Sequence, residues 1–384
     1  MRITVVTSYF PTSARPYGGN SAFQTLVRLK PHASIQVVCP LEHYLNVPFL
    51  KPARYEPADL NWQPPEFETD YVSYPAIPIL SRPFNGPLCA KILLPYVRMT
   101  KPDLILNYWL YPDGYAAMRV ARELGVPVIV GAIGSDLRTR NDPITIRRVR
   151  ETMLGANAVI TVSEDLRRQA IAQGVPAEKI TAIRNGCDTS IFYPGDRAAA
   201  RERLGCEPSA ELIVYAGNLL VTKGLRELVE AFVELAKNRP RLRLAIVGQG
   251  PYGDSLARRA AAAGLEKRVM LPGRADAVGI ANWMHAADIF CLPSYSEGCP
   301  NVVVEALACG RPVVASNVGG IPELVGKASG LLVPPGDSGA LREALDRALF
   351  ERWDSAEIAR TSARSWETVA AETLEICRKL RPNQ

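Results

Sequence analysis

Short runs of apolar residues alternate with stretches of helical periodicity along most of the chain. The runs are rich in Val, Ile and Leu, which is typical of strands buried on both faces. Between them lie segments such as 115–124, whose Ala, Val and Leu positions recur every three or four residues. We expect strands at 3–7, 35–39, 104–107, 126–130, 158–162 and 180–183, and again at 212–215, 242–247, 269–271, 289–292, 313–316 and 330–333.

The two series of strands stand end to end, on either side of a break in the pattern around 188–210. Strand–helix alternation predicts right-handed βαβ units and parallel sheets. We therefore expect an α/β protein of two Rossmann-like domains, an N-terminal one at 1–190 and a C-terminal one at 196–360. In this architecture ligands bind at the carboxyl ends of the strands, and two such edges are expected to face each other across an interdomain cleft.

Residues 41–100 depart from the alternation, because they are rich in Pro and aromatic residues and poorly periodic. We interpret them as a long excursion over the surface. Such a segment fits a structural cover for the sheet edge, or a flap that binds an acceptor or contacts a membrane.

Composition is that of an ordinary globular protein, and 384 residues exceed the usual size of one core. The N-terminal MRITVVTSYFP is too short and too β-branched for a signal peptide, and no apolar run is long enough to span a membrane, which favours the cytoplasm. The eight cysteines and three histidines are dispersed and include no Cys-x-x-Cys pair, which argues against a metal site or a disulfide framework.

The net charge of +6 is concentrated in the first half, where residues 1–190 hold 21 Lys and Arg against 16 Asp and Glu. A basic half fits an anionic ligand or an anionic membrane surface at the inner face of the cell membrane, and it also fits a merely solvated surface. The arginines of 138–150 carry no nucleic-acid motif, so a nucleic-acid partner is not expected.

The segment 294–325 places Glu297 and Glu305 in a stretch otherwise rich in Val, Ala and Gly. A buried carboxylate is costly without a polar partner. Glu297 lies in the turn after a predicted strand, and Glu305 lies in the helix that we expect to begin at Pro300 and end at Gly310. The helix start favours phosphate, and a carboxylate can accept two hydrogen bonds from a diol.

This segment resembles the signature of family 4 of the retaining nucleotide-sugar glycosyltransferases, which have the GT-B fold. The family pattern is Glu, seven residues, Glu, set in SEG-x-PN-x-x-x-EA-x-A-x-G-x-PV-x-x-S-x-x-GG-x-PE, and the sequence SEGCPNVVVEALACGRPVVASNVGGIPE matches it throughout. The resemblance implies that Glu305 binds the donor ribose and Glu297 the donor sugar. The donor-binding set extends over Gly298, Pro300, Asn301 and Val302.

The similarity continues along the C-terminal half. "VYAGNLLVTKGLRELVEAF" resembles the segment in which the family uses an Arg and a Lys to bind the donor diphosphate. Lys223 matches the Lys, whereas Asn218 stands in the place of the Arg. "AIVGQGP" and "LPGRAD" resemble the turns beside the nucleotide. These matches add Gly217, Gly248 and Arg274 to the donor-binding set.

In the N-terminal half, "SYFPTSARPYGGNSAFQTLVRLK" resembles the first strand, glycine loop and helix of the family, in which Gly18 and Gly19 allow close approach to the diphosphate or sugar. "GAIGSDLR" resembles the loop where many relatives carry a His or Arg, a position held here by Ile133. Asp136 in that loop either contacts the acceptor or caps the following helix. "SWETVAAETLEICRKL" resembles the last family helix, so 365–384 is expected to cross back onto the N-terminal domain.

The resemblance implies a retaining transferase that moves a hexose from a nucleoside-diphosphate sugar to a glycan or lipid-linked acceptor, and "YWLYPDGYAAMRVARELGVPV" is similar to teichuronic-acid and exopolysaccharide enzymes. Glu297, Lys223 and Asp136 are the candidate catalytic residues. Because no Asp-x-Asp occurs in the chain, we expect catalysis without a metal or other cofactor. Two alternatives share the architecture: a sugar-nucleotide 2-epimerase, and an inactive sugar-nucleotide-binding subunit.

Overall fold

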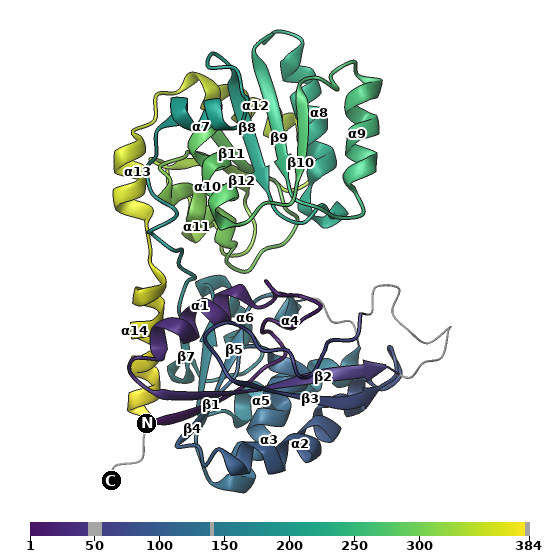
Figure 1. Cartoon of the computed structure of the whole chain (residues 1–384), viewed down its shortest axis with the longest axis vertical. Coiled ribbons are helices and arrows are strands. Elements are labelled where there is room, and N and C mark those ends of the chain that lie inside the picture. Colours follow the sequence, from purple (N-terminus) through teal and green to yellow (C-terminus); the bar gives the residue numbers. More distant parts are fainter. Residues whose placement is uncertain (45–55, 139–141, 381–384) are drawn as a thin grey trace. The chain divides into compact units, whose positions relative to one another are not determined.

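The computed structural model describes residues 1–44, 56–138 and 142–380. The chain forms two compact units, and each is described here by itself (Figure 1). The first unit comprises Met1–Arg184 together with Trp366–Gln384, and the second comprises Asn185–Ser365. The C-terminal helix α14 (Trp366–Lys379) therefore belongs to the first unit, where it packs against α1 (Asn20–Leu29). Residues 381–384 of the predicted last helix lie outside the described residues.

The first unit is built on a seven-stranded sheet in the order β3-β2-β1-β4-β5-β6-β7. All neighbouring strands pair in parallel. The order reverses direction between β1 and β4, so the loops that follow these two strands flank the topological switch point. The strands are β1 (Arg2–Val6), β2 (Ser34–Tyr44), β3 (Thr69–Ala76), β4 (Leu104–Leu106), β5 (Val128–Ala132), β6 (Ala158–Thr161) and β7 (Ile180–Ala182).

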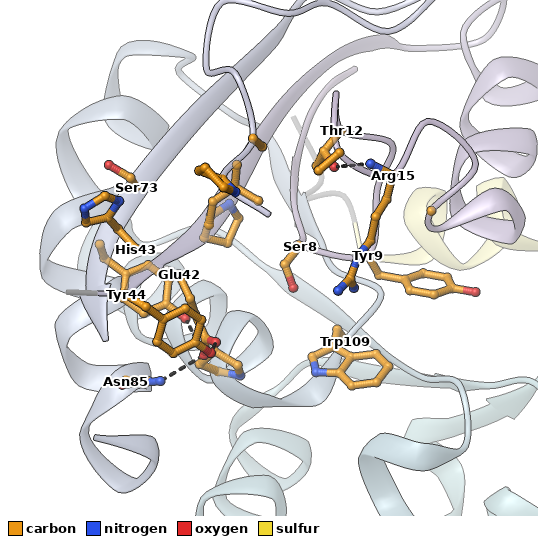
Figure 2. Close-up of a pocket in the computed structure, with 18 of the residues that line it drawn as sticks. Ser8, Tyr9, Thr12, Arg15, Glu42, His43, Tyr44, Ser73, Asn85 and Trp109 are labelled. Atoms are coloured by element: carbon orange, nitrogen blue, oxygen red, sulfur yellow. Dashed lines mark hydrogen bonds between the residues drawn. The ribbon is translucent and has the colours of Figure 1, made fainter. Parts of the chain in front are cut away.

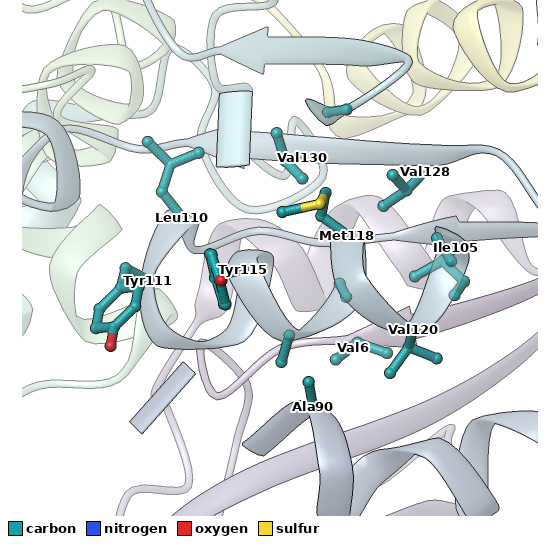
Figure 3. Close-up of a cluster of buried hydrophobic side chains, with 14 of the residues drawn as sticks. Val6, Ala90, Ile105, Leu110, Tyr111, Tyr115, Met118, Val120, Val128 and Val130 are labelled. Carbon is teal, nitrogen blue, oxygen red and sulfur yellow. The ribbon is translucent and has the colours of Figure 1, made fainter. Parts of the chain in front are cut away.

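Helices cover both faces of this sheet and bury a core on each. One core includes side chains of α2, α3 and α5 against Val6, Ile105 and Val130, as Figure 3 shows for part of it. The other core joins α1 and α14 to Ile3 and Leu106 on the opposite face. The helical segments besides α1 and α14 are α2 (Arg82–Met99), η1 (Leu110–Gly114), α3 (Tyr115–Leu124), α4 (Ser135–Arg138), α5 (Pro143–Gly155), α6 (Glu164–Ala172) and η2 (Ala177–Lys179).

The second unit repeats the plan with a six-stranded parallel sheet in the order β10-β9-β8-β11-β12-β13. Its switch point lies between β8 and β11. Helix α8 packs against α9 and α12, while α10 packs against α7 and α11. The strands are β8 (Glu211–Ala216), β9 (Leu242–Val247), β10 (Val269–Gly273), β11 (Ile289–Leu292), β12 (Val313–Ser316) and β13 (Gly330–Val333). The helical segments are α7 (Arg197–Arg203), η3 (Val221–Lys223), α8 (Leu225–Ala236), α9 (Gly253–Ala262), α10 (Ala277–Ala286), α11 (Asn301–Ala308), η4 (Ile321–Glu323), α12 (Ser338–Phe350) and α13 (Ser355–Ser362).

The predicted architecture of two parallel-sheet, Rossmann-like domains is confirmed, but the interpretation of residues 41–100 is wrong. That segment contains the end of β2, the edge strand β3 and the long helix α2, whose Cys89, Leu93 and Val97 are fully buried. Proline hides both elements: an edge strand tolerates Pro75, and α2 contains Pro87 and Pro95. Residues 45–55 of that segment lie outside the described residues.

Candidate functional site

An ion pair joins the two loops that flank the switch point of the second sheet. Lys223 follows β8 in the short turn η3, and Glu297 follows β11. The Lys223 Nζ lies 2.6 Å from Glu297 Oε1, with side chains 25% and 11% exposed. Two side chains predicted to act on the donor are therefore in direct contact, although 74 positions separate them in the chain.

Glycines allow the loops of this edge to pack closely enough for the pair to form. Gly224 has φ +65, and a Cβ there would lie 1.9 Å from the carbonyl oxygen of Pro293. Gly248 has φ +144, and a Cβ there would lie 1.9 Å from the carbonyl oxygen of Gly217. Any side chain at either position would push apart the loops that follow β8, β9 and β11, because backbone atoms cannot yield at such distances.

The loop that carries Glu297 leads into α11, whose first turn offers free backbone donors. Pro300 is the N-cap, and its carbonyl accepts from the N–H groups of Val303 and Val304. In the described part of the chain the N–H groups of Asn301 and Val302 have no acceptor. The start of α11 therefore presents donors and the positive end of a helix dipole, which together favour an anion.

Asn185 holds the start of α11 in place, a role that its sequence context did not reveal. Its side-chain N–H group donates to the Cys299 carbonyl at 3.0 Å and to Asn301 Oδ1 at 2.7 Å. Asn185 is itself buried. The residue lies in the motif RNGCD, whose resemblance to a family turn was the only available signal.

Glu305 lies one turn into α11 and is half-buried. Its carboxylate has no hydrogen-bond or ion-pair partner among the described residues, in contrast to that of Glu297. Burial raises the pKa of Glu305 to about 7. An unpartnered carboxyl group that is this costly to ionise is suited to receive hydrogen bonds from a ligand.

The other predicted donor-site residues of this unit lie at the carboxyl ends of its strands. Gly217 and Asn218 follow β8, Gly248 follows β9, and the exposed Arg274 follows β10. The Asn218 carbonyl accepts from the Tyr215 hydroxyl at 2.9 Å, and its side chain is exposed. The Gly298 carbonyl accepts from Gly320 N–H at 3.0 Å.

Sequence reasoning missed two serines at the same edge. Ser294 and Ser316 follow or end β11 and β12, and their buried hydroxyl oxygens have no partner within the described ranges. A serine at the end of an apolar strand was the available signal.

A separate pocket of about 1420 Å³ lies in the first unit, at the carboxyl ends of its strands around the switch point (Figure 2). Gly18 and Gly19 line it. Two aromatic side chains in its wall, Tyr9 and Trp109, are stacked with ring centroids 6.0 Å apart. In Figure 2 the Arg15 side chain points toward the side of the pocket where Ser8 and Trp109 lie, and it has no acidic partner in the described ranges.

Asp136 is buried beneath this pocket with its carboxylate turned to the backbone. It accepts from the N–H groups of Gly134 at 2.9 Å, Ile133 at 3.1 Å and Leu110 at 3.3 Å. Burial raises the pKa of Asp136 to about 6, although these backbone bonds oppose the rise. The carboxylate thus joins the loops after β4 and β5, rather than capping the helix that it begins.

Across residues 1–44, 56–138 and 142–380, no group of three or more His, Cys, Asp and Glu side chains is placed to hold a metal ion. None of the helices in the described ranges is long and apolar enough to cross a bilayer.

Comparison with known proteins relates both units to glycosyltransferases. Residues 54–191 match the model described as Glycosyltransferase Family 4, and residues 196–366 match the model described as Glycosyl transferases group 1. Among curated proteins, TuaC of Bacillus subtilis (strain 168), named for teichuronic acid biosynthesis, is 30% identical over 97% of this chain and 94% of its own. A D-inositol 3-phosphate glycosyltransferase of Frankia alni is 32% identical over 70% of this chain and 72% of its own.

Solved structures share the fold. Anabaena HepE in complex with UDP has a TM-score of 0.76 and 21% identity, and covers 99% of this chain and 100% of its own. WaaG, a glycosyltransferase of lipopolysaccharide biosynthesis, has a TM-score of 0.71 and 16% identity over 98% of this chain and 99% of its own. These matches identify the two units as those of the GT-B fold. Together with the relationship to TuaC, they show that the chain is a glycosyltransferase and belongs to family 4.

Proposed function

We propose that this enzyme is a retaining glycosyltransferase that moves a hexose from a nucleoside-diphosphate sugar to a hydroxyl of a glycan or lipid-linked acceptor, without a metal ion or other cofactor. The observation that carries the proposal is the set of side chains at the β8/β11 edge: the Lys223–Glu297 pair, the free donors of α11 and the unpartnered Glu305. These groups match, one by one, the chemistry of a ribose, a diphosphate and a sugar.

The carboxylate of Glu305 accepts hydrogen bonds from the ribose diol, and Glu297 accepts them from hydroxyls of the donor sugar. Lys223 and the N–H groups of Asn301 and Val302 bind the diphosphate. Gly217, Asn218, Gly248 and Arg274 line the path of the nucleotide, and Gly298 and Pro300 shape the turn beside it. Gly18 and Gly19 approach the donor from the first unit, whose pocket takes the acceptor.

The transfer exchanges one C–O bond for another at the anomeric carbon. The bond from the anomeric carbon to the diphosphate oxygen breaks, and its electron pair leaves with the diphosphate. The acceptor oxygen attacks on the same face, and its proton passes to an oxygen of the departing phosphate. Lys223 and the start of α11 stabilise the charge that develops there, so that catalysis consists of positioning and electrostatic stabilisation.

Asp136 has a different role in this account from the catalytic one that its motif suggested. Its carboxylate is engaged with three backbone N–H groups, so we assign it as a positioning residue for the loops that border the acceptor pocket. We place the reaction in the cytoplasm at the inner face of the membrane, because the positive charge is concentrated in residues 1–190.

The test is a thermal-shift screen of nucleoside diphosphates and their sugars, followed by product analysis by NMR. One nucleotide base should stabilise the enzyme, by ~2.7 kcal/mol at one hundred times its dissociation constant. The product made from that donor should keep the anomeric configuration of the donor. Isomerised donor in the absence of acceptor would instead indicate an epimerase, and an inverted product would refute retention.

A further inference from the structure

The turn between β3 and α2 presents large apolar side chains to solvent. Ile79, Leu80 and Phe84 are 72%, 68% and 68% exposed, and the exposed Arg82 lies among them. We call these four residues the β3–α2 surface. Apolar side chains grouped in this way mark a contact site more often than isolated exposed ones do.

The backbone holds this surface in position. Ser81 N–H donates to the Ile77 carbonyl at 3.0 Å, Ile77 N–H donates to Ser81 Oγ at 2.7 Å, and Leu80 N–H donates to the Pro78 carbonyl at 2.7 Å. Ile79 is held at φ +66, a left-handed conformation that is strained for a β-branched residue. The fold therefore keeps a strained backbone at the residue that it exposes most, and such strain is found at functional positions.

The charge around this surface is of one sign. Residues 71–102 contain no Asp or Glu, and they contain four cations: Arg82, Lys91, Arg98 and Lys101. Arg98 pairs with Glu123 at 3.2 Å, whereas the other three have no acidic partner in the described part of the chain. Exposed apolar side chains among unpaired cations are complementary to an anionic bilayer, which offers apolar chains below negative head groups.

The acceptor pocket is continuous with this surface. Ile79, Leu80 and Arg82 line one end of the pocket, whereas Tyr9, Arg15 and Trp109 line another part of it. The lining therefore combines an apolar opening with aromatic rings and an unpartnered guanidinium. This combination suits a molecule with a sugar, a phosphate and a lipid chain, because a ring can stack on an aromatic side chain and a phosphate can bind an arginine.

We propose that the β3–α2 surface docks on an anionic bilayer and that the acceptor is lipid-linked, entering the pocket at that surface with its phosphate on Arg15. This inference rests on the proposed glycosyl transfer, because it names the acceptor class for the same enzyme. Docking brings the pocket opening to the plane in which the lipid chain lies, so that the lipid need not leave the membrane completely.

The experiment measures co-sedimentation of the full chain with phosphatidylcholine vesicles, with and without phosphatidylglycerol. We expect binding to the anionic vesicles that weakens with salt, and a loss of about tenfold or more in affinity for Ile79→Ser combined with Leu80→Ser. Phe350→Ser is the matched control, since Phe350 is 87% exposed in the second unit. Circular dichroism melts establish that the variants are folded.

A second arm uses farnesyl phosphate as the pocket probe and an inositol phosphate as its soluble rival. We expect saturable binding of farnesyl phosphate that Arg15→Ser weakens about tenfold or more. Absence of vesicle binding, equal binding by the double variant, or binding of inositol phosphate but not farnesyl phosphate would overturn the inference. So would a dimer in sedimentation velocity that the double variant abolishes. Nucleotide thermal shifts and slow donor hydrolysis report on the second unit, so their failure would refute the transferase proposal instead.

Discussion

Lys223 and Glu297 lie 2.6 Å apart, each on one of the two loops that flank the switch point of the second sheet. The pair orients both side chains before a ligand arrives and offsets the cost of their partial burial. An incoming diphosphate competes with Glu297 for the Lys223 ammonium. Because the pair is coupled, removal of either partner leaves the other unbalanced in a partly buried site.

Lys223→Ala should lower kcat/KM by ~10- to 100-fold, because a charge-assisted hydrogen bond contributes ~1.5–3 kcal/mol. Lys223→Arg should recover part of the loss, since it keeps the positive charge. Lys237→Ala removes an exposed lysine that is paired with Glu234 and serves as the control. Steady-state kinetics of the Lys223→Ala variant at the level of the control variant would show that Lys223 does not act on the leaving group.

Donor binding should depend on pH through Glu305. Burial raises the pKa of this carboxyl group to about 7, whereas hydrogen bonds from a ribose diol favour its ionised form. The affinity for nucleoside diphosphate should therefore rise with pH through 7 and be accompanied by proton release, which calorimetry in buffers of different ionisation enthalpy detects. Glu305→Gln should remove this component of the pH dependence. An identical profile in wild type and variant would contradict the assignment.

The same shift predicts how the stability of the ligand-free enzyme varies with pH. The pKa of Glu305 in the folded state lies above its ordinary value of 4.5, so between 4.5 and 7 the folded state retains a proton that the unfolded state has released. Stability must then fall as pH rises across this window, by up to ~3 kcal/mol from this group. In urea titrations Glu305→Gln should show a smaller decline than the wild type.

Much of this site could be predicted from the sequence because local chemistry specifies it. The spacing of Glu297 and Glu305, the helix start at Pro300 and the apolar strands all depend on neighbouring residues. The Lys223–Glu297 contact depends on two loops that the sheet order brings together, and periodicity cannot reveal this. The roles of Asn185 and Asp136 likewise follow from backbone groups that only the tertiary structure places. Helix α2 was missed because its apolar residues and prolines carry no clear period.

Activity should survive excess EDTA, because Lys223 and the start of α11 are assigned to offset the charge on the diphosphate. Asn218→Arg, which restores the family residue beside the same phosphate site, should not abolish activity and should tighten donor binding. Initial rates with and without EDTA provide the measurement. Loss of activity in EDTA with rescue by magnesium or manganese would contradict this account of the leaving group.

Ile79→Asn should make the enzyme more stable while weakening its binding to anionic vesicles. The left-handed conformation at φ +66 costs a β-branched residue about 1–2 kcal/mol, and asparagine tolerates it better. Urea denaturation should show a gain of up to ~1 kcal/mol in the free energy of unfolding. A destabilised variant would mean that the Ile79 side chain makes packing contacts that outweigh the strain.

The division of labour between the two glutamates is the central claim, and calorimetric titration tests it most directly. The nucleoside diphosphate selected by the thermal-shift screen and the corresponding nucleotide sugar are titrated into Glu297→Ala and Glu305→Ala, with wild type as reference. Glu305→Ala should weaken binding of both ligands, whereas Glu297→Ala should weaken binding of the nucleotide sugar alone. Equal weakening of the free nucleoside diphosphate by the two substitutions would contradict the separate roles assigned to Glu297 and Glu305.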